Sequence, residues 1–145
     1  MLLDKISILK CKNDDYRFVY NLSRRNMEHY VKEHWGGWNS KIFRDTFDKS
    51  NIKIVKYKKR KVGFYDIAIE GCEMYLKNIQ ITLMLRGKGV GAFLMKEIER
   101  EAKNSKIKKI KLRTFKNNPA NKFFSQEGYI IIDNDKSSVV MEKNI

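Results

Sequence analysis

The feature that most constrains the fold of this chain is a glycine-rich loop between a predicted strand and a predicted helix. The segment Leu85–Ala92 reads Leu-Arg-Gly-Lys-Gly-Val-Gly-Ala and has three glycines within five positions. Glycines let a backbone approach a ligand closely, and the first N–H groups of a following helix can point at a bound anion. Arg86 and Lys88 add positive charge. The loop therefore indicates a phosphate-binding loop, although the glycines alone would also fit a tight turn.

The flanking segments favour phosphate binding. Before the loop, Met74–Ile81 alternates as a strand does, with Tyr75, Ile79 and Ile81 on one face and Met74 and Leu76 on the other. After the loop, apolar residues recur at helical spacing and charged residues occupy the other face. The apolar residues are Val90, Phe93, Leu94, Ile98 and Ala102, and the charged residues are Lys96, Glu97, Glu99, Arg100 and Lys103.

Two common nucleotide-binding motifs do not fit this loop. A P-loop requires a second glycine followed by Lys and Ser or Thr, which the sequence lacks. The dinucleotide fingerprint can be placed on Gly87, Gly89 and Ala92, but it needs an acidic residue at the end of the next strand. That strand ends Leu112-Arg113-Thr114, and too little chain follows Gly91 to complete a doubly wound sheet.

Two motifs resemble those of GNAT-type N-acetyltransferases. Arg86–Gly91 resembles their acyl-CoA pyrophosphate loop, Gln/Arg-x-x-Gly-x-Gly/Ala. Asn117–Tyr129 (Asn-Asn-Pro-Ala-Asn-Lys-Phe-Phe-Ser-Gln-Glu-Gly-Tyr) resembles their element Asn-x-x-Ala-x-x-Phe-Tyr-x-x-x-Gly-Phe. The motifs occur in the family's order and approximate separation. They cover about the C-terminal half of the chain, and the order of predicted elements extends the resemblance, less specifically, over the rest.

The length of 145 residues, the single proline and the absence of repeats or linkers predict one domain over residues 1–145. The predicted strands are 2–9, 52–57, 62–69, 74–81 and 107–113, with a hairpin over 129–141 that turns at Asn134-Asp135. The first predicted helix is capped by Asn13 or Asp14 and runs to about Trp35. Further helices are predicted over 40–48, from Val90, and over 120–126. This order resembles the GNAT fold, an α/β (α+β) fold with a mixed, largely antiparallel central sheet of about six to seven strands, flanked by helices and splayed between the fourth and fifth strands.

The resemblance implies an acyl-CoA site formed largely by backbone groups. Strand groups of Ile79, Gln80 and Ile81 would pair with the pantetheine arm. The pyrophosphate would lie on Arg86, Gly87, Lys88, Gly89, Val90 and Gly91, with no metal required because amides, helix dipole and two cations supply the positive field. Asn117 would bind the cofactor arm or simply cap a helix, and Phe124 would pack against the pantetheine or in the core.

The implied reaction is direct attack of a primary amine on the thioester of acetyl-CoA, with a backbone N–H near Ile79 stabilising the oxyanion. Glu73 is the candidate base, although it lies two residues before the family's glutamate position, which Tyr75 occupies. An exposed strand-end carboxylate is the alternative role for Glu73. Glu33, His34 and Asp66 are further candidates for the base.

Phe124 departs from the family, because a tyrosine usually stands there to protonate the departing CoA thiolate. Ser125, Tyr129 or water could replace it, since a thiol of pKa ~8.5 is a tolerable leaving group. The departure also keeps open a non-catalytic acyl-CoA sensor. Trp35 and Trp38 are candidates for a wall of the acceptor pocket or for packing between helices and sheet.

The formal charge of +14 raises the alternative of a basic nucleic-acid-binding domain. Its basic residues are scattered, however, and the densest run, Lys56–Lys61, lies between two predicted strands as a solvated hairpin tip. We expect a cytoplasmic protein without a membrane partner, since Met1–Lys5 does not open a signal peptide or membrane span. Cys11 and Cys72 lack a metal-ligand pattern. Either the C-terminal hairpin or a sheet edge could support a homodimer.

Overall fold

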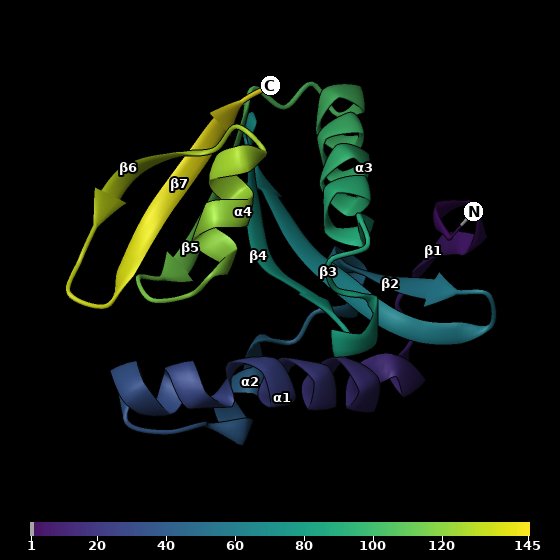
Figure 1. Ribbon diagram of the computed structural model, residues 1–145, viewed down its shortest axis with the longest axis horizontal. Coiled ribbons are helices and arrows are strands. Elements are labelled where there is room, and N and C mark those ends of the chain that lie inside the picture. Colours follow the sequence, from purple (N-terminus) through teal and green to yellow (C-terminus); the bar gives the residue numbers. More distant parts are fainter. Residues whose placement is uncertain (1) are drawn as a thin grey trace. The chain divides into compact units, whose positions relative to one another are not determined.

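The computed structural model describes residues 2–145, which form a mixed seven-stranded sheet with the order β1-β2-β3-β4-β5-β7-β6 (Figure 1). The pair β4/β5 is parallel, whereas β1/β2, β2/β3, β5/β7 and β6/β7 are antiparallel. The strands are β1 Ile6–Lys10, β2 Ile52–Tyr57, β3 Arg60–Glu70, β4 Glu73–Ile81, β5 Lys109–Phe115, β6 Ile130–Asn134 and β7 Ser138–Asn144. The predicted mixed, largely antiparallel sheet is confirmed.

The α-helices are α1 Tyr16–Trp35, α2 Ser40–Thr46, α3 Val90–Asn104 and α4 Ala120–Gln126. Helix α1 ends at Gly36, which has a left-handed φ of 88°. This is the C-terminal stop that the sequence predicts, because glycine adopts this conformation without a Cβ clash. In the described part of the chain, no helix is both long and apolar enough to span a bilayer.

The chain divides into two compact units, which are described separately. The first contains the residues up to Asp66 together with Asn78–Lys88, and the second contains Ile67–Lys77 together with Gly89–Ile145. The single domain over residues 1–145 stays a prediction.

The first unit has a core shared by α1 and the first strands. Phe18, Phe43 and Phe47 pack against its buried residues, which are Cys11, Val19, Leu22, Ile52, Ile54 and Phe64. In β2 the buried Ile52 and Ile54 flank a less buried Lys53, whereas Phe64 of β3 lies in a run of four buried residues, 62–65. Side chains from α2 are therefore part of the packing that holds α1.

Asp15 is a buried carboxylate at the start of α1. Its Oδ2 accepts a hydrogen bond from the Lys12 N–H at 2.8 Å, and its Oδ1 lies 2.5 Å from Lys61 Nζ. Burial opposes ionisation, but the hydrogen bonds from Lys61 and Lys12 outweigh it, so the pKa of Asp15 is lowered. Burial, with the negative charge of Asp15, raises the pKa of the Cys11 thiol to about 11. The N-cap of this helix was predicted at Asn13 or Asp14, whereas the N-cap is Asp15, because a 3-10 turn over Asn13–Asp15 precedes α1.

The second unit contains the amphipathic α3, whose buried residues are Val90, Leu94, Met95, Ile98 and Ala102. Glu99 of this helix accepts hydrogen bonds from Tyr129 Oη at 3.3 Å and Lys143 Nζ at 3.0 Å. Burial and the negative charge of Glu99 raise the pKa of Tyr129. The hydroxyl of Tyr129 is therefore a donor within the unit and keeps its proton near neutral pH.

Several strand boundaries differ from the prediction, and two strands begin at least two residues later than predicted. The first strand was predicted to begin at Leu2, but Leu3–Lys5 is a 3-10 turn and the ladder with β2 begins at the pair Ile6↔Tyr57. The fifth strand was predicted from Ile107, but the Ile107 N–H bonds the carbonyl of Ala102 at the end of α3. In both cases a neighbouring turn binds backbone groups that the residue pattern assigned to a strand.

Gly63 of β3 lies unusually close to β4. A Cβ added at Gly63 would stand 2.7 Å from the carbonyl oxygen of Gln80. Both atoms belong to the first unit, and the contacted atom is backbone, so a side chain at Gly63 could be accommodated only if a strand moved.

The first prediction concerns the Asp15 carboxylate. Asp15→Ala should lower the free energy of unfolding by about 1–3 kcal/mol, because it leaves a buried amide and an ammonium group without their acceptor. Since folding lowers the pKa of Asp15, its contribution is present above the unfolded pKa of ~3.9 and is lost as the pH falls through the lower folded pKa. Urea denaturation at a series of pH values measures this. The exposed neighbour Asp14→Ala is the control, and an Asp15→Ala effect independent of pH would contradict the assignment.

The second prediction concerns Gly63. Gly63→Ala should destabilise the fold by about 1–3 kcal/mol, since overpacking against the Gln80 carbonyl exceeds the smaller gain from a stiffer unfolded chain. Chemical denaturation provides the free energy, and amide hydrogen exchange in β4 should increase most near Gln80. Ser7→Ala, on an exposed position of β1, should stay within about 0.5 kcal/mol of wild type. Unchanged stability and exchange in Gly63→Ala would refute the close approach.

Candidate functional site

Strand β4 loses its parallel partner part of the way along its length. The ladder with β5 runs from Glu73↔Lys109 to Leu76↔Leu112, whereas β4 continues to Ile81. This is the splay that the sequence predicts between the fourth and fifth strands. The predicted pantetheine-binding residues Ile79, Gln80 and Ile81 lie in the portion beyond the ladder and are partly buried. A strand edge without a partner can bind an extended ligand through its backbone.

A chain of amide side chains holds this portion of β4 to α1 in the first unit. Asn26 Nδ2 donates to Gln80 Oε1 at 3.0 Å, and Gln80 Nε2 donates to Asn78 Oδ1 at 2.8 Å. Asn78 Nδ2 in turn donates to the hydroxyl of the buried Ser23 at 3.3 Å. Four polar side chains thus form one continuous network.

The sequence interpretation identified the backbone of Gln80 but missed Ser23, Asn26 and Asn78. One signal was available, because side chains of a strand alternate and the apolar register of Met74 and Leu76 continues into two amides. Amides in a buried register need partners. The partners themselves lie on α1, more than 50 residues earlier, and no local pattern identifies them.

The glycine loop has the backbone conformation that its composition predicts. Gly87 and Gly89 have φ values of 73° and 84°, which residues with a Cβ rarely adopt. A 3-10 turn with a buried Leu85 precedes the loop, and Gly89 is the N-cap of α3. The Phe93 N–H bonds the Gly89 carbonyl at 3.0 Å. The amides of Val90 and Gly91 therefore belong to the first turn, where a helix leaves N–H groups without intrahelical acceptors.

The cations of the loop remain available. The side chains of Arg86 and Lys88 are exposed, and neither makes a salt bridge with any described residue. The first unit thus has two unpaired cations in this loop, and the second has the N-terminus of α3 with its free N–H groups; each of these features favours an anion.

The second motif forms the start of α4 in the second unit. The Ala120 N–H donates to Asn118 Oδ1 at 2.9 Å, so Asn118 satisfies this first amide of the helix. Asn121 Nδ2 donates to the carbonyls of Phe115 and Lys116 and thereby ties α4 to the end of β5. Asn117 is exposed, and its cofactor contact stays a prediction.

Phe124 lies in the core of the second unit. It is buried, and its ring centroid lies 5.3 Å from that of Phe123 and 6.0 Å from that of Tyr129. Core packing therefore accounts for Phe124 without a ligand. Of the two side chains considered as replacements for the family tyrosine, Ser125 is exposed, whereas Tyr129 donates to Glu99.

Glu73 is the first residue of β4 and belongs to the second unit. Its Oε1 lies 3.3 Å from Lys111 Nζ on β5, and its side chain is 43% exposed. The carboxylate is therefore half-exposed and ion-paired, which fits a strand-end salt bridge as well as a base. Its catalytic role stays a prediction.

The other candidate residues lie in the first unit. His34 Nε2 is 3.9 Å from Glu33 Oε2 at the end of α1, and Asp66 pairs opposite Ile52 in β3. Trp38 Nε1 donates to Tyr20 Oη at 3.1 Å, so it packs between α1 and α2.

The predicted cofactor residues are divided between the two units. Ile79, Gln80, Ile81, Arg86, Gly87 and Lys88 belong to the first unit, and Gly89, Val90, Gly91, Asn117 and Phe124 belong to the second. Residues 2–145 contain no group of three or more His, Cys, Asp or Glu side chains that could hold a metal ion. Both cysteines are free thiols.

Solved structures of N-acetyltransferases share this fold. PaiA N-acetyltransferase from Thermoplasma acidophilum, in complex with coenzyme A, is 18% identical with a TM-score of 0.79, over 97% of this chain and 99% of that chain. The ribosomal-protein-S18-alanine N-acetyltransferase from Escherichia coli is 15% identical with a TM-score of 0.75, over 97% and 94%. Arabidopsis thaliana Naa50, in complex with the bisubstrate analogue CoA-Ac-MVNAL, is 17% identical with a TM-score of 0.68, over 97% and 99%. No curated protein sequence matches the chain.

The sequence itself matches a family model. The model of the acetyltransferase (GNAT) domain matches residues 25–139, which is most of the chain and includes β4, the glycine loop and α4. The expected fold agrees with this match, and the glycine loop with its positive φ at Gly87 and Gly89 lies within the matched region. The chain belongs to the GNAT acetyltransferase family.

Proposed function

We propose that this protein transfers an acetyl group from acetyl-CoA to a primary amine by direct attack in a ternary complex. The observation that carries the proposal is the glycine loop at the start of α3, with positive φ at Gly87 and Gly89 and unpaired cations at Arg86 and Lys88. Family membership and the coenzyme A bound to PaiA support the same donor.

Each cofactor segment has a proposed role. The backbone of Ile79, Gln80 and Ile81 pairs with the pantetheine arm, because the ladder with β5 ends at Leu76. The pyrophosphate binds the amides of Gly87 to Gly91 and the side chains of Arg86 and Lys88. Asn117 bonds the cofactor arm, and Phe124 supplies an apolar contact.

The amine attacks the thioester carbonyl, and a backbone N–H near Ile79 stabilises the oxyanion that forms. The resulting ammonium group loses a proton, and Glu73 is proposed as the base that accepts it through water. When the tetrahedral intermediate collapses, the C–S bond breaks and the CoA thiolate leaves. Phe124 has no proton to donate, so water or Ser125 protonates the thiolate. A thiol pKa of ~8.5 makes unassisted departure tolerable.

The acceptor amine is proposed to be a peptide N-terminus or a small amine. Peptide acceptors are favoured by two similar structures, the ribosomal-protein-S18-alanine N-acetyltransferase and the Naa50 complex with its peptide-containing analogue. A second candidate function is a non-catalytic acyl-CoA sensor, because Phe124 lacks the acid and Glu73 is ion-paired with Lys111. Normal CoA binding without turnover on any amine would distinguish the sensor.

The cofactor assignment predicts the effect of two changes in the loop. Arg86→Ala should weaken acetyl-CoA binding by about tenfold, the usual scale of one charge-assisted hydrogen bond. Gly89→Asp should abolish binding, since φ of 84° is strained for aspartate and its carboxylate repels phosphate. Calorimetric titration measures both, with Lys96→Ala on the exposed face of α3 as the charge-matched control. A wild type without saturable binding would exclude the cofactor site.

The catalytic assignment predicts a selective loss of turnover. Glu73→Gln should lower kcat by about 10²-fold or more, the scale of general base catalysis, while the Kd of acetyl-CoA stays unchanged. Thiol release measured with a panel of peptide and small amines provides kcat, and calorimetry provides the Kd. Glu70→Gln, at the exposed end of β3, is the control. If Glu73→Gln retains full kcat, another residue is the base.

A further inference from the structure

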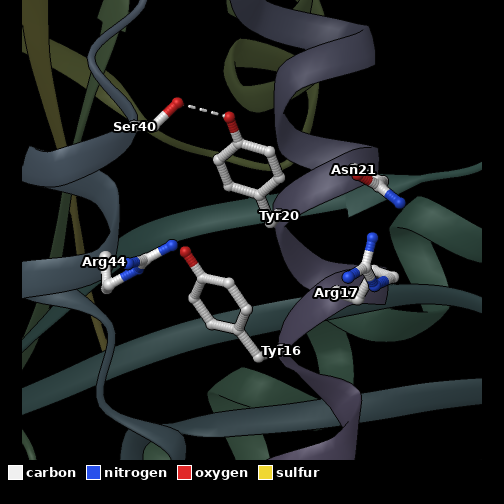
Figure 2. Close-up of a pocket in the computed structure, with 6 residues that line it drawn as sticks. All are labelled: Tyr16, Arg17, Tyr20, Asn21, Ser40 and Arg44. Carbon is white, nitrogen blue, oxygen red and sulfur yellow. Dashed lines mark hydrogen bonds between the residues drawn. The ribbon is translucent and has the colours of Figure 1, made fainter.

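A groove between α1 and α2 lies within the first unit and is not part of the proposed acetyl-CoA site. It has a volume of about 240 Å³ and is lined by Tyr16, Arg17, Tyr20, Asn21, Ser40 and Arg44 (Figure 2). Four of these residues come from α1 and two from α2, and none of them is acidic.

The two guanidinium groups of the groove are uncompensated. Within the part of the chain that the structure describes, neither Arg17 nor Arg44 makes a side-chain hydrogen bond or a salt bridge. Nearby cations on the same helices are neutralised, since Arg24 lies 2.9 Å from Glu28 and Lys41 lies 2.6 Å from Asp45. Two unpaired cations therefore line a concave, acid-free surface.

The aromatic wall of the groove is held in place. Tyr20 Oη is 2.6 Å from Ser40 Oγ and accepts hydrogen bonds from Arg24 and from Trp38 Nε1. The Tyr16 ring stacks on Tyr20, with centroids 6.0 Å apart. Figure 2 shows both tyrosines pointing from α1 toward α2, with the Arg44 guanidinium and the Tyr16 hydroxyl directed toward one another. The groove thus presents hydrogen-bond donors beside a wall of two tyrosines that neighbouring side chains hold in place.

We propose that this groove binds the phosphate group of a small molecule. Each guanidinium can donate two parallel hydrogen bonds to a phosphate, and one unpaired arginine from each helix lines the groove. A carboxylate has only two oxygens to share. The volume is below the ~300 Å³ at which pockets for drug-sized ligands begin, so the ligand is small.

Part of the groove lies outside the region that the family model matches, and Ser40 and Arg44 lie inside it. The matched family region begins at residue 25, so the four lining residues on α1 precede it. The proposal does not depend on acetyl transfer, and a phosphate at this groove is distinguishable from one at the glycine loop by variants of each.

The test follows the indole N–H of Trp38 by NMR during titration with inorganic phosphate at constant ionic strength. This N–H is a local reporter because it donates to Tyr20 Oη, and Trp35→Phe assigns its signal. The shift should saturate, and Arg44→Gln or Arg17→Gln should weaken the Kd by about tenfold or more. Arg25→Gln, another exposed arginine on α1, should leave the Kd unchanged. Gly89→Asp should also leave it unchanged, because it disables only the glycine loop.

A comparison of two ligands, phosphoethanolamine and inorganic phosphate, identifies the kind of phosphate that binds. Phosphoethanolamine binding more tightly than inorganic phosphate would identify a phosphomonoester as the ligand, and equal or weaker binding would identify free phosphate. A linear shift, a shift that chloride reproduces, or tighter binding of acetate would overturn the proposal. So would an unchanged Kd in Arg44→Gln and Arg17→Gln, whose folding is checked by circular dichroism. If one of the two variants unfolds, the phosphate Kd of the other variant tests the proposal.

Discussion

The point at which β4 parts from β5 determines what the rest of the structure can do. Up to Leu76 the strand has a parallel partner, and Met74 and Leu76 are buried. Beyond that point the same side of the strand carries Asn78 and Gln80, which are hydrogen-bonded to α1. A strand that loses its neighbour on one edge also loses backbone hydrogen bonds, and a partly buried amide is stable only with a partner. The side-chain network from α1 thus secures β4 where the ladder ends, and the strand edge stays available for another extended chain.

The elements that the sequence predicted best are those specified by local backbone requirements. Glycines with positive φ ended α1 at Gly36 and formed the loop at Gly87 and Gly89. The apolar periodicity of α3 also placed its buried face, although Phe93 is only partly buried. The prediction of β1 was less accurate because its start depends on pairing with Tyr57, far away in sequence. Local conformation is readable from residue types, whereas a strand end depends on the neighbour that it finds.

In the candidate site, too, local conformation was predictable from the sequence and contacts between distant residues were not. The conformation of the glycine loop was predictable because it follows from a few glycines with positive φ. The network of Ser23, Asn26, Asn78 and Gln80 was not, since it joins residues that are more than 50 positions apart. Asp15 illustrates the same limit, because acidic residues near a helix start predict capping, whereas its second oxygen binds Lys61 on β3. Side-chain pairs between different helices and strands can be identified only from the three-dimensional structure.

The two proposed sites, the loop and the groove, represent two different ways to bind phosphate in a chain of formal charge +14. Net charge raises the local concentration of every polyanion and gives no selectivity among them. Selectivity has to come from fixed donors. The loop fixes backbone amides through glycine conformation and so suits a pyrophosphate that lies along the chain. The groove fixes its tyrosine wall through helix packing, with Tyr20 bonded to Ser40 and Trp38, and two unpaired arginines lie beside that wall. Because Gly89–Gly91 belong to the second unit and the groove to the first, a substitution in α2 can alter the groove while the conformation at Gly89 stays intact.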